Sequence, residues 1–157
     1  MRNSILALSA VLLILSASSG GCSSGSDKSA MKSSDSKSSA QLYDKKWMIQ
    51  DLEGKRVVLP EGGSEMFMQI SADGKASGMT GCNNFTGTAK LSGGKITFSP
   101  LATTRKMCPE QIMNYEKSFL DAIQKTASYS ISGSTLTFKD ASGSALATFV
   151  SARTMGQ

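Results

Sequence analysis

The sequence predicts a mainly β domain of the α+β class, in which an antiparallel sheet of about eight strands curls into a partial barrel covered by one helix. Two observations lead to this prediction. Between residues 46 and 150, short apolar runs are separated by turns rich in glycine, asparagine and aspartate, which is typical of short strands. A single segment, residues 109–125, carries its apolar residues at helical spacing instead.

The strands are expected where apolar residues, many of them β-branched or aromatic, recur at every second position. Asp73-Gly74 lies between two such runs and is typical of a hairpin, because glycine accepts the positive φ that the turn requires. Pro60 ends the second run, since proline cannot donate a hydrogen bond to a sheet. The expected strands cover residues 46–52, 56–59, 65–71, 76–79, 85–91, 95–99, 128–131, 135–139 and 144–150.

The helix is expected to begin at Pro109, because the first helical position does not need a backbone N–H. Its apolar stripe predicts that the helix plugs or covers the open side of the sheet. The stripe consists of Ile112, Met113, Tyr115, Phe119, Leu120 and Ile123. The acidic residues of the helix are expected mostly opposite this stripe, as solvated charges; they are Glu110, Glu116 and Asp121.

Residues 1–21 are predicted to be a signal peptide, with a positive start at Arg2, an apolar run over residues 5–15 and small residues after it. The apolar run is too short to cross a bilayer as a helix, which needs about 20 residues. Gly20-Gly21-Cys22 resembles the box recognised by the bacterial lipoprotein signal peptidase. The resemblance implies that Cys22 becomes the first mature residue and carries a lipid on its sulfur.

Ser19 stands where that box prefers leucine, so ordinary cleavage after residues 17–19 and free secretion form the alternative. Residues 22–40 are rich in serine and contain no aromatic or β-branched side chain. Such a segment cannot bury enough apolar surface to fold, and it is expected to be a flexible tether. The alternative interpretation is that residues 22–40 form a flexible terminus with no function. The expected location is the cell envelope, with residues 41–153 forming a domain anchored to a bacterial membrane and facing the periplasm or the exterior.

The composition excludes several classes of function. The chain contains no histidine, so it lacks the commonest general base and metal ligand, and it cannot form a serine–histidine or cysteine–histidine pair. The net charge of +5 is small and scattered, which argues against a nucleic-acid partner. Met66 and Met68 could suit copper(I), but on a strand they share one face, which favours the core. We therefore expect no catalytic residues, no metal site and no cofactor.

Two motifs identify the domain. The first runs from Gly81 to Gly87, and the second runs from Thr104 to Cys108 and leads into the helix. In this order and at this separation, they resemble the META domain (HslJ-like) family over residues 42–150. The residues that carry the resemblance are Gly81, Cys82, Asn83, Phe85, Gly87, Thr104 and Cys108.

The resemblance implies a half-open, cracked antiparallel barrel with one helix. It also implies a frequent setting in bacterial envelope lipoproteins, with links to heat stress and antibiotic tolerance, and no established enzymatic activity. The fold is similar to a cracked barrel of type III secretion pilotins, which bind lipid or a partner's tail.

The motif residues also permit a physical interpretation. Asn83 and Asn84 suit turns, so we expect a buried polar turn that pins the sheet, with a binding surface on the same loop as the alternative. If Cys22 carries a lipid, Cys82 and Cys108 are left, and an oxidising compartment permits a disulfide between them. Two buried thiols are the alternative.

Three classes of function follow from these features. The first is a non-catalytic envelope lipoprotein that binds an unknown protein partner or supports envelope stress tolerance. The second is a carrier of a small apolar ligand or lipid beneath the helix. A freely secreted structural or interaction domain applies if Cys22 is not lipidated. An enzyme, the third class, would have to work without histidine.

Overall fold

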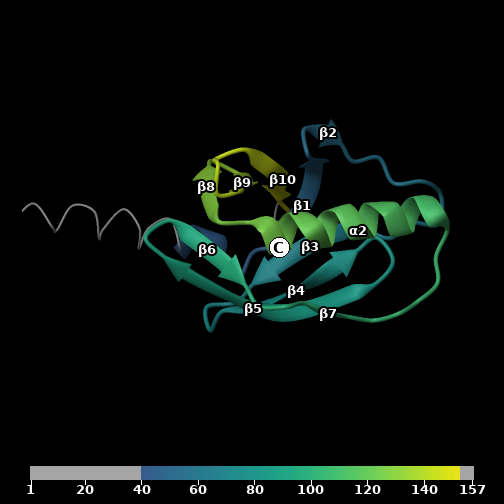
Figure 1. Ribbon diagram of the computed structural model, residues 1–157, viewed down its shortest axis with the longest axis horizontal. Coiled ribbons are helices and arrows are strands. Elements are labelled where there is room, and N and C mark those ends of the chain that lie inside the picture. The colour runs from purple at the N-terminus through teal and green to yellow at the C-terminus, as the bar shows by residue number, and fades with distance from the viewer. Residues whose placement is uncertain (1–39, 153–157) are drawn as a thin grey trace, which may run out of the picture.

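A computed structural model describes residues 40–152 of the chain (Figure 1). The predicted signal peptide, the predicted lipid site at Cys22 and nearly all of the predicted tether lie outside the described residues. The helix is α2, Glu110–Lys125. The strands are β1 (Trp47–Leu52), β2 (Lys55–Arg56), β3 (Met66–Ile70), β4 (Lys75–Thr80), β5 (Asn84–Ser92), β6 (Lys95–Phe98), β7 (Ala102–Thr103), β8 (Ser128–Ser132), β9 (Thr135–Lys139) and β10 (Ala145–Ser151).

Eight strands form an antiparallel ring in the order β1, β3, β4, β5, β6, β8, β9 and β10. The ring closes because β10 also pairs with β1, from Trp47 opposite Ser151 to Leu52 opposite Ala147. The predicted mainly β barrel with one helix is therefore confirmed, and it is closed rather than half-open. The shortest pairing in the ring is between β6 and β8, which share only the register pair Lys95–Ser128.

Two strand predictions were wrong in detail. The second expected strand, residues 56–59, shrinks to β2, because β3 occupies the same edge of β1 near Trp47 and the chain after Arg56 leaves β1 toward the start of α2. The short strand β7, which pairs with Phe85 and Thr86 of β5, was not predicted. Two residues are too few to show an alternating pattern.

The helix α2 lies across the barrel (Figure 1). Of its predicted apolar stripe, Ile112, Phe119 and Ile123 are fully buried, whereas Met113, Tyr115 and Leu120 are partly exposed. The ring of Phe119 lies 5.9 Å from that of Phe85 and 6.0 Å from that of Phe149, measured between centroids. These aromatic contacts join the helix to opposite parts of the sheet. Met66 and Met68 are buried in the same core, as predicted.

The helix begins one residue later than predicted. Pro109 precedes the first helical residue, with φ −50° and ψ 143°, and its carbonyl oxygen accepts hydrogen bonds from the N–H groups of Ile112 and Met113. Within residues 40–152, no helix combines the length and the apolar character that a bilayer span requires.

Gly78 in β4 offers a test of how closely the barrel is packed. A Cβ atom at this position would stand 2.0 Å from the carbonyl oxygen of Phe67 and 2.6 Å from the ring of Phe85. We expect Gly78→Ala to lower the free energy of unfolding by about 2–3 kcal/mol, because neither the backbone nor the packed ring can move away cheaply. Urea unfolding measures the change.

The matched control is Ser77→Ala in the same strand, a partly exposed position, for which we expect a change within about 0.5 kcal/mol. Equal losses for the two variants would contradict the packing described around Gly78.

Candidate functional site

The side chain of Asn83 is the centre of a buried polar cluster. Its Oδ1 accepts hydrogen bonds from Thr104 Oγ1 at 2.8 Å and from the backbone N–H of Lys106 at 2.7 Å. Its Nδ2 donates to the carboxyl oxygens of Glu116 at 3.0 and 3.1 Å. One side-chain amide therefore joins the loop before α2 to the helix itself.

Glu116 corrects a prediction. It was expected to be a solvated charge, but it is only 7% exposed. Its carboxyl group also accepts the backbone N–H of Asn83 at 3.1 Å and the hydroxyl of Thr80 at 2.5 Å. A buried carboxyl group needs such donors, because burial without them is costly. The signal was present in the sequence, since Glu116 follows Ile112 by four residues and precedes Phe119 by three, on the same helix face.

The expected buried polar turn is thus confirmed at Asn83: its backbone bonds to Thr80 within the turn, whereas the partners of its side chain lie on other segments. Asn84 is exposed, and its backbone N–H donates to Thr104 Oγ1 at 3.1 Å. Glu110 is exposed, and Asp121 pairs with Lys117 at 2.8 Å.

A disulfide joins Cys82 to Cys108, with Cα atoms 6.2 Å apart. The alternative of two free thiols is set aside, and the bond ties the Asn83 turn to the residue before Pro109. Gly81 beside it has φ +94°, which favours glycine. The motif residues Gly81, Cys82, Asn83, Thr104 and Cys108 are brought together at one end of the barrel.

The other two motif residues lie in β5. Phe85 is buried in the core, and Gly87 faces Leu101, whose Cδ2 atom would stand 2.6 Å from an added Cβ. Both therefore serve packing. Among residues 40–152, no three His, Cys, Asp or Glu side chains come together in a way that could hold a metal ion.

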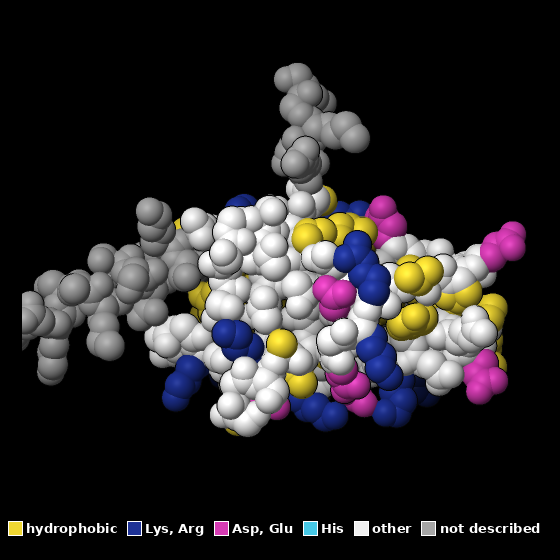
Figure 2. Space-filling view, turned by 90° about the horizontal axis from the view of Figure 1, so that it is seen from above, with side chains coloured by type: hydrophobic (Ala, Val, Ile, Leu, Met, Phe, Trp, Pro, Cys, Tyr) yellow, Lys and Arg dark blue, Asp and Glu magenta, His cyan; other side chains and the backbone are white. Residues whose placement is uncertain are grey.

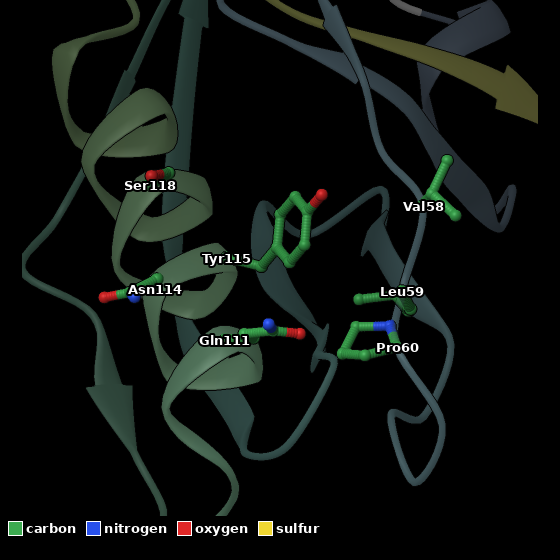
Figure 3. Close-up of a pocket in the computed structure, with 7 residues that line it drawn as sticks. All are labelled: Val58, Leu59, Pro60, Gln111, Asn114, Tyr115 and Ser118. Atoms are coloured by element: carbon green, nitrogen blue, oxygen red, sulfur yellow. The ribbon is translucent and has the colours of Figure 1, made fainter.

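A surface groove lies next to this cluster, between the chain that follows β2 and the first half of α2 (Figure 3). Its volume is about 520 Å³. Tyr115 and Gln111 point from the helix toward the opposite wall (Figure 3). The lining residues, none of them charged, are Val58, Leu59, Pro60, Gln111, Asn114, Tyr115 and Ser118. Sequence reasoning did not find this groove, because its two walls are about 50 residues apart in the chain.

The groove and the polar cluster share supports. Leu59 and Ile112 stand over Gly81, with side-chain atoms 3.5 Å from the point where its Cβ would lie. The carbonyl oxygen of Gly81 also accepts the N–H of Ser64 at 2.8 Å. The Asn83 turn therefore holds both walls of the groove, one through Ser64 and one through α2.

Charged groups stand beside the groove rather than in it. Glu61 follows Pro60 and Glu110 precedes Gln111, and both are exposed. Next to Ser118, Lys117 donates a hydrogen bond to Asp121, which lowers the pKa of Asp121 and raises that of Lys117. Both groups are largely exposed, so this pair contributes little to stability.

The groove lies at the end of the barrel opposite the point where the chain enters. At the entry, the N–H of Asp44 donates to the carbonyl oxygen of Ile70, the last residue of β3. At the other end, Ser64 bonds Gly81 just before β3 begins. Ser64 and Ile70 are six positions apart, which corresponds to about 20 Å of extended chain.

The sequence pattern described as META domain matches residues 40–153, which is most of the chain. The chain belongs to the META domain family. No curated protein matches the sequence.

Three solved structures are similar to this META domain protein. One NMR structure shares 25% identity and has a TM-score of 0.60, covering 74% of this chain and 97% of its own. An NMR structure of a protein from Burkholderia xenovorans shares 20% identity at a TM-score of 0.58, covering 90% and 99%. The crystal structure of a DUF4847 family protein from Bacteroides vulgatus shares 14% identity at a TM-score of 0.52, covering 69% and 93%. The last two show the fold alone.

Glu116→Gln tests the buried cluster of this META domain. The amide group of glutamine would turn N–H donors toward the N–H donors of Asn83, so one hydrogen bond is lost and a buried donor is left unpaired. We expect the free energy of unfolding to fall by about 1–3 kcal/mol in urea titrations. The exposed Glu110→Gln serves as the control, with a change within about 0.5 kcal/mol. A neutral Glu116→Gln variant would contradict the structural role of the cluster.

The disulfide gives a second test. The two cysteines are 26 residues apart, and closing such a loop stabilises a protein by about 3.5 kcal/mol in the chain-entropy estimate. We expect the Cys82→Ala, Cys108→Ala double variant to lose about this amount in urea unfolding while its far-ultraviolet circular dichroism stays native. Addition of a reductant to the unchanged protein should give the same loss. If the reductant leaves stability untouched, the two cysteines are not bonded.

Proposed function

We propose that this META domain protein is a non-catalytic module of the bacterial cell envelope, held to a membrane by a lipid on Cys22. In this proposal, the groove between residues 58–60 and α2 is the face presented to a protein partner, and the pairing supports the envelope under stress. The main support for this proposal is the position of the groove, which lies at the end of the barrel opposite the point where the chain enters at Asp44.

The chemistry of the described residues supports a binding role. The chain has no histidine, and the buried carboxyl group of Glu116 is engaged by Thr80 and Asn83 rather than turned toward a cavity. The groove is concave and free of charge, with apolar side chains on the wall of residues 58–60 and mainly neutral polar side chains on the wall of α2. Such a combination of apolar surface and a few polar groups suits recognition.

A carrier of an apolar ligand held beneath α2 is supported less well. The space beneath the helix is filled by the rings of Phe85, Phe119 and Phe149, whose centroids are about 6 Å apart. Side chains of this kind close the interior of a small barrel.

Intact-mass analysis tests the anchor. We expect the natural protein to fractionate with membranes, to begin at Cys22 and to carry the added mass of a lipid. Cys22→Ala should abolish both the added mass and the membrane association, because the thioether that holds the lipid cannot form. A natural protein that is soluble and begins after residues 17–19 would instead establish free secretion.

Photo-crosslinking tests the groove. A crosslinking amino acid at Val58, which is 71% exposed, should give a discrete adduct in intact cells. The matched control replaces Lys90, an exposed residue near the far end of β5. We expect the Val58 adduct to be absent from the control and to weaken when Tyr115→Ala removes one wall. The same adducts from both positions, or none from either, would contradict the groove as the binding face.

A further inference from the structure

The chain after β2 has unused backbone hydrogen-bonding groups. Val57 donates its N–H to the carbonyl oxygen of Gln50 at 3.0 Å, which extends the pairing of β2 with β1 by one bond. Beyond it, neither Val58 nor Leu59 makes a backbone hydrogen bond to any other residue that the structure describes. An edge of this kind is a template for another strand.

The side chains of the same segment behave as they would in a strand. Val58 is 71% exposed, whereas Leu59 packs over Gly81. The residues themselves, Arg56-Val57-Val58-Leu59, favour strand structure, which is why the sequence predicted a strand over residues 56–59. The segment thus has strand composition and side-chain alternation, but it lacks a partner for Val58 and Leu59.

The opposite wall offers contacts for the side chains of an incoming segment. Tyr115 and Gln111 point across the groove toward residues 58–60 (Figure 3). No charged side chain lines the groove, so a neutral segment matches it. At the rim, Glu61 and Glu110 are exposed, and acidic side chains stand at the tip of this end of the domain (Figure 2). These two carboxylates favour a cation at that end of the occupant.

The serine-rich residues 23–39 of the same chain do not match this site, because they contain no β-branched or aromatic side chain. We infer that the groove takes an extended segment of a partner protein that is rich in β-branched residues and uncharged where it lies in the groove. This segment adds to the sheet as a strand beside Val58 and places a Lys or Arg near Glu61 and Glu110. The inference rests on the proposed function, and it names the chemistry of the partner.

The test uses the full chain and a synthetic peptide in which one lysine is followed by alternating threonine and valine residues. We expect binding at peptide concentrations below about 1 mM, with slowed hydrogen exchange at the amide of Val58, which faces the edge opposite the one that Val57 turns toward β1. The matched control is the same peptide with alternate backbone nitrogens methylated, which keeps every side chain and removes ladder donors. It should bind at least about tenfold more weakly, because each lost ladder bond costs affinity.

Two protein variants complete the test. Val58→Pro removes an N–H that the folded chain does not use, so the thermal midpoint should hold while peptide affinity falls by about tenfold or more. Val58→Thr keeps the N–H and should bind within about threefold of the unchanged protein.

Equal binding of the methylated peptide, unchanged exchange at the Val58 amide, or no binding at about 1 mM would each overturn strand addition. A Val58 crosslink to an envelope protein would in that case still uphold the proposed function, so the two failures can be told apart.

Discussion

The contact between the Asn83 amide and the Glu116 carboxyl group is the constraint on which the rest of this structure depends. It connects the turn after β4, the loop that leads into α2, and the helix, in a buried position at one end of the barrel where unpaired polar groups are costly. The disulfide between Cys82 and Cys108 secures the same junction covalently. The amide–carboxyl contact and the disulfide together hold the first half of α2 in place. Phe119 holds the second half through its ring contacts with Phe85 and Phe149.

The family motif therefore has a structural reason. Gly81 allows the turn, Asn83 and Thr104 fill it with hydrogen bonds, and Cys82 fixes it. Gly81, Cys82 and Asn83 are buried, the exposed Thr104 bonds to Asn83 through its hydroxyl, and both walls of the groove rest on this turn. A rigid support beneath a recognition surface lowers the cost of ordering that surface when a partner binds. The groove faces away from the end at which the chain enters, which is compatible with the proposed lipid anchor at Cys22.

Much of the fold could be predicted from the sequence, because alternating strands and a helical stripe report burial directly. The closure of the ring could not, since the pairing of β1 with β10 joins residues about 100 positions apart. The composition of Val57–Leu59 favours a strand, but a strand also needs an adjacent strand with an unoccupied edge. Here β3 already pairs with that edge of β1. Glu116 was misjudged because its charge was weighed above its position on the buried face of α2, and the groove was missed because neither wall carries a motif.

A double-mutant cycle on Asn83 and Glu116 tests the central claim most directly. The free energies of unfolding of Asn83→Ala, Glu116→Ala and the double variant are measured in urea against the unchanged protein. If the two side chains support each other, the losses are not additive, and the double variant is more stable than the sum predicts by about 1–3 kcal/mol. Losses that add within about 0.5 kcal/mol would mean that the contact does not hold α2 to the barrel.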